Sequence, residues 1–496
     1  MRSENASDFL LVLDEGTTST RAILYAPDGT IIGVAQRELT QHYPAPGLIE
    51  HDAGEIWTQT LACARMMVEQ AGGPSRIAAI GITNQRETVL AWDRRSGQPL
   101  GRAIVWQDRR TAEICEALRA AGHEAMVRDK TGLLLDPYFS ATKMRWMLDH
   151  WPAVTAAGDA LAFGTVESWL VWKLTGGLHI TDASNASRTM LMALDGPDWD
   201  DDLLALHGLA RSALPEIVDT AGVFGHTSPD LFGAPIPICG LAGDQQAATI
   251  GQQCLRAGQV KATLGTGAFV LASTGTVIPR SSHRLLGTVL AQMGGRRTYA
   301  LEGSVFVAGS LVKWLRDQLC MVVAAAETET LARSVADNGG VCILPALSGL
   351  GAPHWRAEVR GHIAGLSHST GRAHIVRAAL ETIAHQMHDL QTAFAADGAP
   401  WHDLRIDGGM SANDWIAQDL ADMLDLRVER PAGVETTALG AAMLAGVGCG
   451  FYDGLEEAAV MRKGAKPFPP AMAEGARAAR LAQWHDLLAT ELAKHA

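Results

Sequence analysis

A run of four polar residues interrupts an apolar stretch early in the chain. Residues 77–92 read IAAIGITNQRETVLAW, with Asn84, Gln85, Arg86 and Glu87 side by side in the middle. Placing such charges beside a hydrophobic core is costly unless each one is paired or contacts a ligand. We therefore expect this cluster to belong to a binding site for a polar molecule.

Two short turns rich in glycine and threonine have the composition of phosphate-binding loops. They are DEGTT at 14–18 and LGTG at 264–267. Gly16 lets the backbone approach an anion closely, successive N–H groups in such a turn can hold phosphate oxygens, and Asp14 suits Mg²⁺ bound through water. Either turn alone is equally well an ordinary hairpin. Two of them facing each other across a cleft would hold a polyphosphate from both sides.

Two further stretches place polar groups where a strand gives way to a helix. In LAGDQQAA, Asp244 follows an apolar run, where α/β folds place catalytic groups, and it can equally cap the helix that follows. In DGGMSAND, at 407–414, glycines precede a helix whose N-terminus favours a phosphate, although a simple turn has the same composition. Trp106 and Tyr138, aromatic residues in polar surroundings, suit either the wall of a ligand pocket or a core.

The elements that must position these groups are strands followed by helices, which indicates the α/β class. Residues 9–36 have the pattern of a meander of three strands. Helical spacing follows over 52–71, with Asp52 as its N-cap, and IAAIGIT at 77–83 has the composition of a buried strand.

The same opening recurs in the second half of the chain. VKATLGTGAFVLASTGTVIP, from residue 260, again gives a strand, a Gly/Thr turn and a strand. We therefore predict two related α/β domains, 1–253 and 254–496. The alanine-rich tail after Phe468 has the pattern of a surface helix.

Composition excludes several classes of partner. The 496 residues are 47% hydrophobic and carry a formal net charge of -13, which disfavours a nucleic acid or an anionic membrane as partner. The seven cysteines include no C-x-x-C pair, so we expect reduced core thiols and a cytoplasmic protein. Neither a signal-peptide core nor an apolar run of membrane-spanning length is expected.

Twelve separated motifs resemble the FGGY family of carbohydrate kinases, and among its members those that phosphorylate glycerol. In chain order they are LDEGTTSTRA, HDAGEIW, AAIGITNQRET, AIVWQDRRTAEICE, TGLLLDPYFSATK, NASRTML, AGDQQAA, LGTGAF, ALEGSVF, PALSGLGAPHW, LRIDGG and ETTALGAAMLAG. The resemblance implies two actin- and hexokinase-like ATPase domains, of the ribonuclease H-like type, flanking a cleft where ATP and a polyol meet. It also implies a homo-oligomer, either a dimer or a tetramer.

The resemblance assigns roles to individual residues. Asp244 would be the general base that takes a proton from a terminal hydroxyl of glycerol, giving glycerol 3-phosphate, and Asp14 and Asp244 would hold Mg²⁺. The polyol would be bound by Arg86, Glu87, Trp106, Tyr138, Asp244, Gln245 and Phe269, in which Trp106 and Phe269 form an apolar wall. The nucleotide would be bound by Thr17, Thr18, Ser19, Arg21, Thr266, Gly309, Gly409 and Asn413.

Other functions stay open on the sequence alone. A kinase of the same family acting on erythritol, xylulose or another small polyol or ketose would carry most of these motifs. An actin- or chaperone-like ATPase would explain the two phosphate turns but would leave Arg86, Glu87 and Asp244 without a task. A non-enzymatic scaffold would leave Asp14 and Asp244 vestigial.

Three residues depart from the family pattern. Glu15 replaces a glutamine and would add negative charge near ATP, with an effect on metal demand or nucleotide affinity. His354 replaces a tyrosine, and Lys313 replaces a glutamine on the nucleotide side, where it is either a phosphate contact or solvated. SPDLFGAPIPICG lacks the arginine of a fructose-bisphosphate loop, so we predict no inhibition by that sugar.

Overall fold

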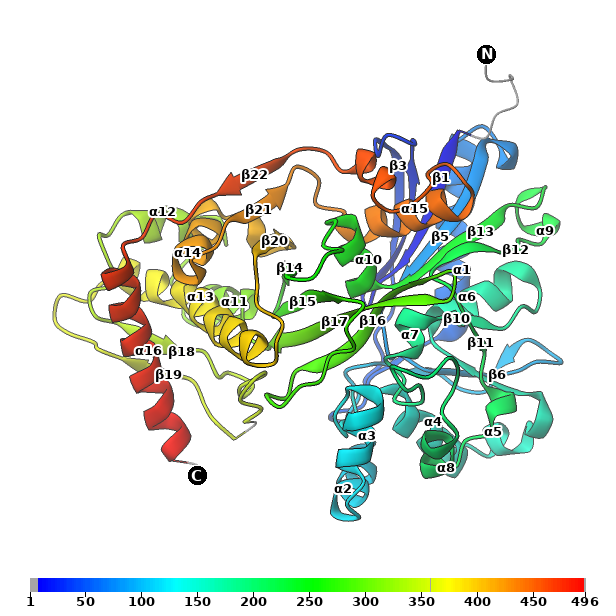
Figure 1. Ribbon diagram of the computed structural model, residues 1–496, viewed down its shortest axis with the longest axis horizontal. Helices are drawn as coiled ribbons and strands as arrows, with labels where there is room; N and C mark the ends of the chain where they lie inside the picture. The colour runs from blue at the N-terminus through cyan, green and yellow to red at the C-terminus, as the bar shows by residue number, and fades with distance from the viewer. Residues whose placement is uncertain (1–7, 357, 495–496) are drawn as a thin grey trace.

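The computed structural model describes residues 8–356 and 358–494, which form two lobes, each built on one large sheet (Figure 1). The sheet of the first lobe has the strand order β12-β13-β5-β1-β2-β3. Its strands are β1 (Phe9–Glu15), β2 (Ser19–Tyr25), β3 (Ile31–Glu38), β5 (Ile77–Asn84), β12 (Ala221–His226) and β13 (Pro237–Gly243). Strands β1, β2 and β3 are antiparallel neighbours, and β1, β5 and β13 run parallel. The predicted meander and the buried strand after it are confirmed.

The sheet of the second lobe repeats this arrangement, with the order β16-β17-β15-β14-β20-β21-β22. Its strands are β14 (Gln259–Leu264), β15 (Ala268–Gly275), β16 (Leu286–Met293), β17 (Arg296–Val305), β20 (Asp403–Asp407), β21 (Val428–Pro431) and β22 (Ala465–Phe468). β14 pairs antiparallel with β15 and parallel with β20, as β1 pairs with β2 and β5. The recurrence of strand, Gly/Thr turn and strand is therefore a recurrence of topology.

Helices cover both faces of the first sheet. α1 (Ala53–Gln70) begins where Asp52 accepts the N–H groups of Gly54 and Glu55, the predicted cap, and it packs with α6 (Val166–Thr175) on one face. The other face carries α10 (Asp244–Gly251) and α15 (Thr436–Gly448). α15 lies so close to the sheet that a Cβ on Gly81 would come 2.4 Å from a backbone oxygen of the helix.

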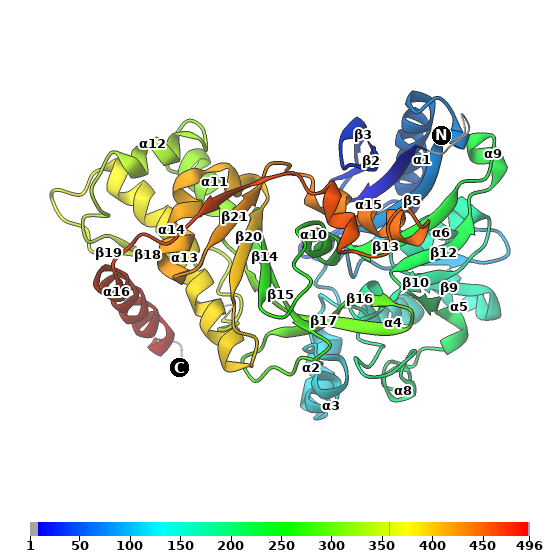
Figure 2. The same cartoon turned by 45° about the horizontal axis from the view of Figure 1, so that its top comes forward.

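α15 follows the strands of the second lobe in the chain yet packs on the sheet of the first (Figure 2). The division of the chain at residue 253 stays a prediction. The hairpin of β16 and β17 reaches in the same direction, since Leu286, Val289 and Tyr299 join a core cluster of first-lobe residues. Segments from the second half of the chain therefore pack against the first lobe at two places.

The C-terminal helix α16 (Glu474–Ala493) docks on the second lobe by burying Trp484 and Leu488. It lies beside α13 (Arg372–Ala396), at the end of the molecule away from the first sheet (Figures 1 and 2). The predicted helix after Phe468 is confirmed. The other helices of this lobe are α11 (Gly309–Asp317), α12 (Glu327–Arg333) and α14 (Asp414–Leu424).

Shorter elements complete the chain. In the first lobe they are β4 (Glu50–His51), β6 (Leu90–Asp93), β7 (Gln98–Pro99), β8 (Ala103–Ile104), α2 (Ala112–Ala120), α3 (Glu124–Thr131), α4 (Ser140–His150), α5 (Pro152–Ala156), β9 (Leu161–Gly164), β10 (Ile180–Asp182), α7 (Ala183–Ala186), α8 (Asp201–His207), β11 (Glu216–Val218) and α9 (Pro229–Phe232). In the second they are β18 (Cys342–Leu344), β19 (His362–Ala364) and the 3-10 turn η4 (Gly409–Ala412). Among the described residues, no helix combines the length and the apolar character that crossing a membrane requires.

Candidate active site

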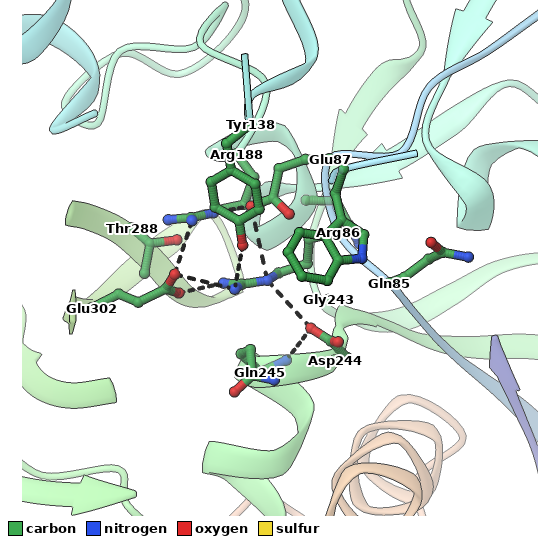
Figure 3. Close-up of polar contacts among 12 residues, drawn as sticks. Gln85, Arg86, Glu87, Tyr138, Arg188, Gly243, Asp244, Gln245, Thr288 and Glu302 are labelled. Atoms are coloured by element: carbon green, nitrogen blue, oxygen red, sulfur yellow. Dashed lines mark hydrogen bonds and ion pairs between the residues drawn. The ribbon is translucent and has the colours of Figure 1, made fainter. Parts of the chain in front are cut away.

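Three parallel strands of the first sheet end side by side, and the polar groups singled out in the sequence follow them. Glu15 of β1 pairs with Asn84 of β5, which pairs in turn with Gly243 of β13. Arg86 and Asp244 stand just beyond these ends, and the Arg86 Nε lies 3.3 Å from the Asp244 Oδ1 (Figure 3). Side chains at the carboxyl edge of such a sheet are well placed to contact a ligand.

Arg86 is buried and held by a partner from the other lobe. Its Nη1 donates to the Glu302 Oε2 at 2.5 Å and its Nη2 to the Glu302 Oε1 at 3.2 Å, and Nη2 also lies 3.4 Å from the Tyr138 hydroxyl (Figure 3). Glu302 belongs to β17. Burial acts to raise the pKa of Glu302, but Arg188 and Arg86 outweigh it and hold that pKa below its ordinary value.

Arg188 joins the two glutamates of this site. It is fully buried, and its Nε donates to the Glu87 Oε1 at 2.6 Å while its Nη2 donates to the Glu302 Oε1 at 3.0 Å. Glu87 has a positive φ of 62°, a conformation that a residue other than glycine adopts at a cost. Buried Lys143 donates to the carbonyl oxygens of Tyr138 and Phe139 at 2.5 and 3.2 Å and lies 3.5 Å from that of Glu87. These bonds hold the Glu87 and Tyr138 segments together.

Three aromatic rings border the charged groups. Trp106 meets Tyr138 edge to face, with ring centroids 5.6 Å apart, and meets Phe269 of β15 in the same manner at 6.4 Å. The Trp106 Nε1 donates to the Thr17 Oγ1 at 3.0 Å, which joins this wall to the first Gly/Thr turn. Because Phe269 comes from the second sheet, both lobes contribute to the wall.

Asp244 is the first residue of α10, and the residue before it, Gly243, is the N-cap. Asp244 is thus not the cap of that helix; its Oδ1 accepts the N–H of Gln245 at 2.6 Å, and 34% of its side chain is exposed. Burial raises the pKa of Asp244, Arg86 and Lys261 oppose this, and Asp14 adds to it. Lys261, from β14, donates to the Gln245 Oε1 at 2.6 Å.

Glu15 does not bring charge to the site. It is fully buried against α1, where the Thr60 hydroxyl donates to its Oε2 at 2.8 Å. Burial raises the pKa of Glu15 to about 8, so the carboxyl is protonated at neutral pH. The prediction that Glu15 adds negative charge near the nucleotide is therefore wrong. Successive side chains of a strand point to opposite faces, so Asp14 and Glu15 face different ways.

The two Gly/Thr turns have different neighbours. In the first turn, the Gly16 N–H donates to the Ser19 carbonyl at 3.0 Å, and Thr18 is exposed. In the second turn, Thr266 is exposed, and its carbonyl accepts the N–H groups of Ala308 and Ser310, each at 3.0 Å, at the start of α11.

Gly309 and Gly409 lie near the second turn. A Cβ on Gly309 would come 2.5 Å from the Gly265 oxygen and 3.1 Å from the Met410 Cγ, so the turn, α11 and η4 meet here. Gly409 has open space where a side chain would stand. Asn413 accepts the N–H groups of Trp415 and Ile416 and so caps α14. Lys313 is exposed on α11.

Comparison with known proteins identifies the family. The family model described as the N-terminal domain of the FGGY family of carbohydrate kinases matches residues 9–251, and that for the C-terminal domain matches residues 260–449. The chain belongs to the FGGY family of carbohydrate kinases. The resemblance noted in the sequence is thereby confirmed.

Individual relatives of this carbohydrate kinase match almost from end to end. Glycerol kinase from Rhodospirillum centenum is 53% identical over 96% of this chain and 97% of its own, and that from Xanthobacter autotrophicus is 54% identical over the same shares. The crystal structure of Plasmodium falciparum glycerol kinase with ADP has a TM-score of 0.93 at 34% identity, covering 98% of each chain. Xylulose kinase from Rhodospirillum rubrum has a TM-score of 0.87 at 27% identity, covering 97% of this chain and 98% of that one. The predicted fold of two actin- and hexokinase-like domains is confirmed.

Asp14 and Asp244 are the candidate ligands for a magnesium ion. Asp14 forms an ion pair with Arg21, and Arg21 pairs in turn with Glu435 of the second half of the chain at 2.5 Å. Burial raises the pKa of Asp14 and Arg21 opposes it, while Asp14 in turn raises the pKa of Asp244. Carboxylate oxygens are ligands that Mg²⁺ prefers, so the residue types of Asp14 and Asp244 suit this ion.

Four charged groups of this site were missed by the sequence prediction, namely Arg188, Lys261, Glu302 and Glu435. Arg188, Glu302 and Glu435 stand inside or beside motifs of the family, NASRTML, ALEGSVF and ETTALG. Glu302 and Lys261 interrupt apolar strands in the same way as Arg86 does. A charged residue within an apolar strand is therefore a signal by which Glu302 and Lys261 could have been predicted.

Proposed function

We propose that this kinase transfers the γ-phosphoryl group of ATP to a terminal hydroxyl of glycerol, giving glycerol 3-phosphate. The observation that carries the proposal is the buried Arg86, whose guanidinium contacts the Asp244 carboxylate and the Tyr138 hydroxyl beside a wall of three aromatic rings. The end-to-end identity to relatives named glycerol kinase supports the choice of polyol.

In the proposed reaction Asp244 is the general base. Its partly exposed carboxylate takes the proton of the attacking hydroxyl, and the Arg86 Nε, 3.3 Å away, fixes its orientation. Burial and Asp14 raise the pKa of Asp244, which makes it a stronger base than an exposed aspartate. Phosphoryl transfer of this kind depends on position and charge neutralisation more than on covalent chemistry.

The polyol hydroxyls each need a donor and an acceptor. Arg86 donates and Glu87 accepts, so two adjacent hydroxyls can be satisfied together, and Gln245 adds an amide. The rings of Trp106, Tyr138 and Phe269 would cover the carbon chain of a three-carbon polyol. The same wall disfavours longer substrates such as erythritol or xylulose, the second candidate class.

ATP and Mg²⁺ would occupy the other side of the site. We assign the phosphates to Thr17, Thr18, Ser19, Arg21 and Thr266, and the rest of the nucleotide to Gly309, Gly409 and Asn413. Asp14 and Asp244 would hold Mg²⁺, which neutralises charge on the phosphate oxygens when it is bound. We further propose that the protein is a cytoplasmic homo-oligomer. Light scattering would measure the mass of this oligomer.

The test is an ADP-release assay with Mg-ATP against glycerol, erythritol, dihydroxyacetone and xylulose in parallel, with ATP alone as the control. We expect saturable turnover with glycerol at the highest kcat/KM. A higher kcat/KM with a longer polyol would move the substrate and keep the kinase. ATP use that is indifferent to all four would refute the proposal and favour an ATPase driven by a partner.

A further inference from the structure

A cluster of histidines surrounds one buried aspartate in the second lobe. Asp389 of α13 is 9% exposed, and its two oxygens have separate partners. Its Oδ1 lies 3.1 Å from the His485 Nε2 of α16. Its Oδ2 accepts the Trp484 Nε1–H at 2.9 Å and lies 3.4 Å from the His354 Nε2. One carboxylate therefore joins three segments of the second lobe.

His388, one residue before Asp389, brings a further nitrogen to this cluster. One donor atom each from His388, Asp389 and His485 can be chosen so that all three lie within 4.8 Å of one another. The His388 Nδ1 is buried and has no hydrogen-bond partner among the described residues. A buried nitrogen without a partner is unfavourable, so His388 has an unmet demand for a hydrogen-bond partner or a ligand.

We propose that His388, Asp389 and His485 form a binding site for a divalent metal ion of the zinc class. Two imidazoles and one carboxylate are a typical zinc ligand set, with water completing the tetrahedron. Ligand atoms around such an ion stand about 3.4 Å apart, given bonds of about 2.0–2.1 Å. The Asp389 and His485 donors already have nearly this separation, and His485, half exposed on a surface helix, has room to adjust.

The surroundings suit a metal ligand. Trp484 and His354 hold the Oδ2 of Asp389, which fixes the carboxylate and leaves Oδ1 for the ion, as outer partners do in zinc sites. Imidazole ligands favour Zn²⁺, Ni²⁺ or Co²⁺ over Mg²⁺.

An ion here would tie α16 to α13. The C-terminal helix otherwise docks through Trp484 and Leu488 and through ion pairs such as that of Arg480 with Asp419. Metal binding to the folded state alone raises stability, so the ion would act on the docking of α16. None of its three residues belongs to the polyol or nucleotide set, and the proposal does not depend on the proposed reaction.

The experiment is calorimetric titration of Zn²⁺ into the full chain, without a polyhistidine tag and after treatment with a chelator. We expect one ion per chain, a rise in Tm with Zn²⁺ but not with Mg²⁺, and a tetrahedral visible spectrum with Co²⁺. His388→Asn and His485→Asn should each weaken binding about tenfold or more and remove the spectrum. His368→Asn, which changes an exposed histidine elsewhere, is the matched control.

Two results would overturn the proposal. One is the absence of stoichiometric Zn²⁺ binding to the wild-type chain, which would leave a hydrogen-bonded histidine cluster. The other is equal binding by the wild type and both variants. Circular dichroism, and ADP release with Mg-ATP after the chelator has been removed, show whether each variant is folded, so a lost Zn²⁺ signal cannot be mistaken for misfolding.

Discussion

The substitution Glu302→Gln tests whether the second lobe positions the substrate-binding arginine. Glu302 accepts three hydrogen bonds, two from Arg86 and one from Arg188, and all three residues are buried. Glutamine keeps the shape but replaces one acceptor oxygen with a donor that faces an arginine. Each charge-assisted bond contributes about 1.5–3 kcal/mol, so the loss of one corresponds to roughly a ten- to hundredfold effect.

We expect Glu302→Gln to raise KM for glycerol by that factor, because Arg86 loses its fixed position, and to lower Tm. KM for ATP should change little, since Glu302 contacts none of the groups assigned to the nucleotide. Steady-state kinetics with each substrate varied in turn would measure this split. Glu167→Gln is the matched control, because Glu167 is fully buried in the first lobe and hydrogen-bonded to Thr165 and Thr181. If KM for glycerol stays at the wild-type value, Glu302 does not position Arg86.

Three further substitutions test the assigned roles. Asp244→Asn should lower kcat by roughly 10²–10⁴-fold while ATP binding, measured by calorimetry, persists; a variant that keeps most of its kcat would exclude Asp244 as the base. Arg86→Ala should raise KM for glycerol roughly ten- to hundredfold, and an unchanged KM would remove Arg86 from the polyol site. Glu15→Gln should stabilise the protein more at pH 8 than at pH 5, which chemical denaturation at the two pH values would measure. The folded pKa of Glu15, about 8, exceeds its ordinary value, so wild-type stability falls as pH rises between these values; a pH-independent difference would contradict the buried acid.

Much of the fold could be predicted because its signals are local. The meander at the N-terminus, its counterpart from residue 259 and the helix capped by Asp52 follow from periodicity and turn residues within short windows. The same logic was available for Glu15, since two consecutive strand residues cannot face one ligand. The prediction that Glu15 adds charge to the site was wrong because it rested on the residue type alone. The alternation of side chains along the strand places Glu15 on the opposite face from Asp14.

The candidate site could be predicted only as far as its motifs extend. The sequence predicted Arg86, Glu87 and Asp244 as site residues because each stands at the end of an apolar run. Their partners depend on packing between distant segments: 216 positions separate Arg86 from Glu302, and 414 separate Arg21 from Glu435. No local pattern specifies such a pair.

The Arg86–Glu302 and Arg21–Glu435 pairs differ in what they hold together. Glu302 and Glu435 both come from the second half of the chain, and each pairs with an arginine that follows a strand end or turn of the first sheet. The Arg86–Glu302 pair is buried, so separating it would leave uncompensated charges at a large cost, whereas the Arg21–Glu435 pair is partly exposed and costs little to break. Glu435 is the N-cap of α15, which packs on the first sheet, so of these two pairs only Arg86–Glu302 joins the two large sheets. Arg86 therefore keeps this partner only while the hairpin of β16 and β17 stays packed against the first lobe.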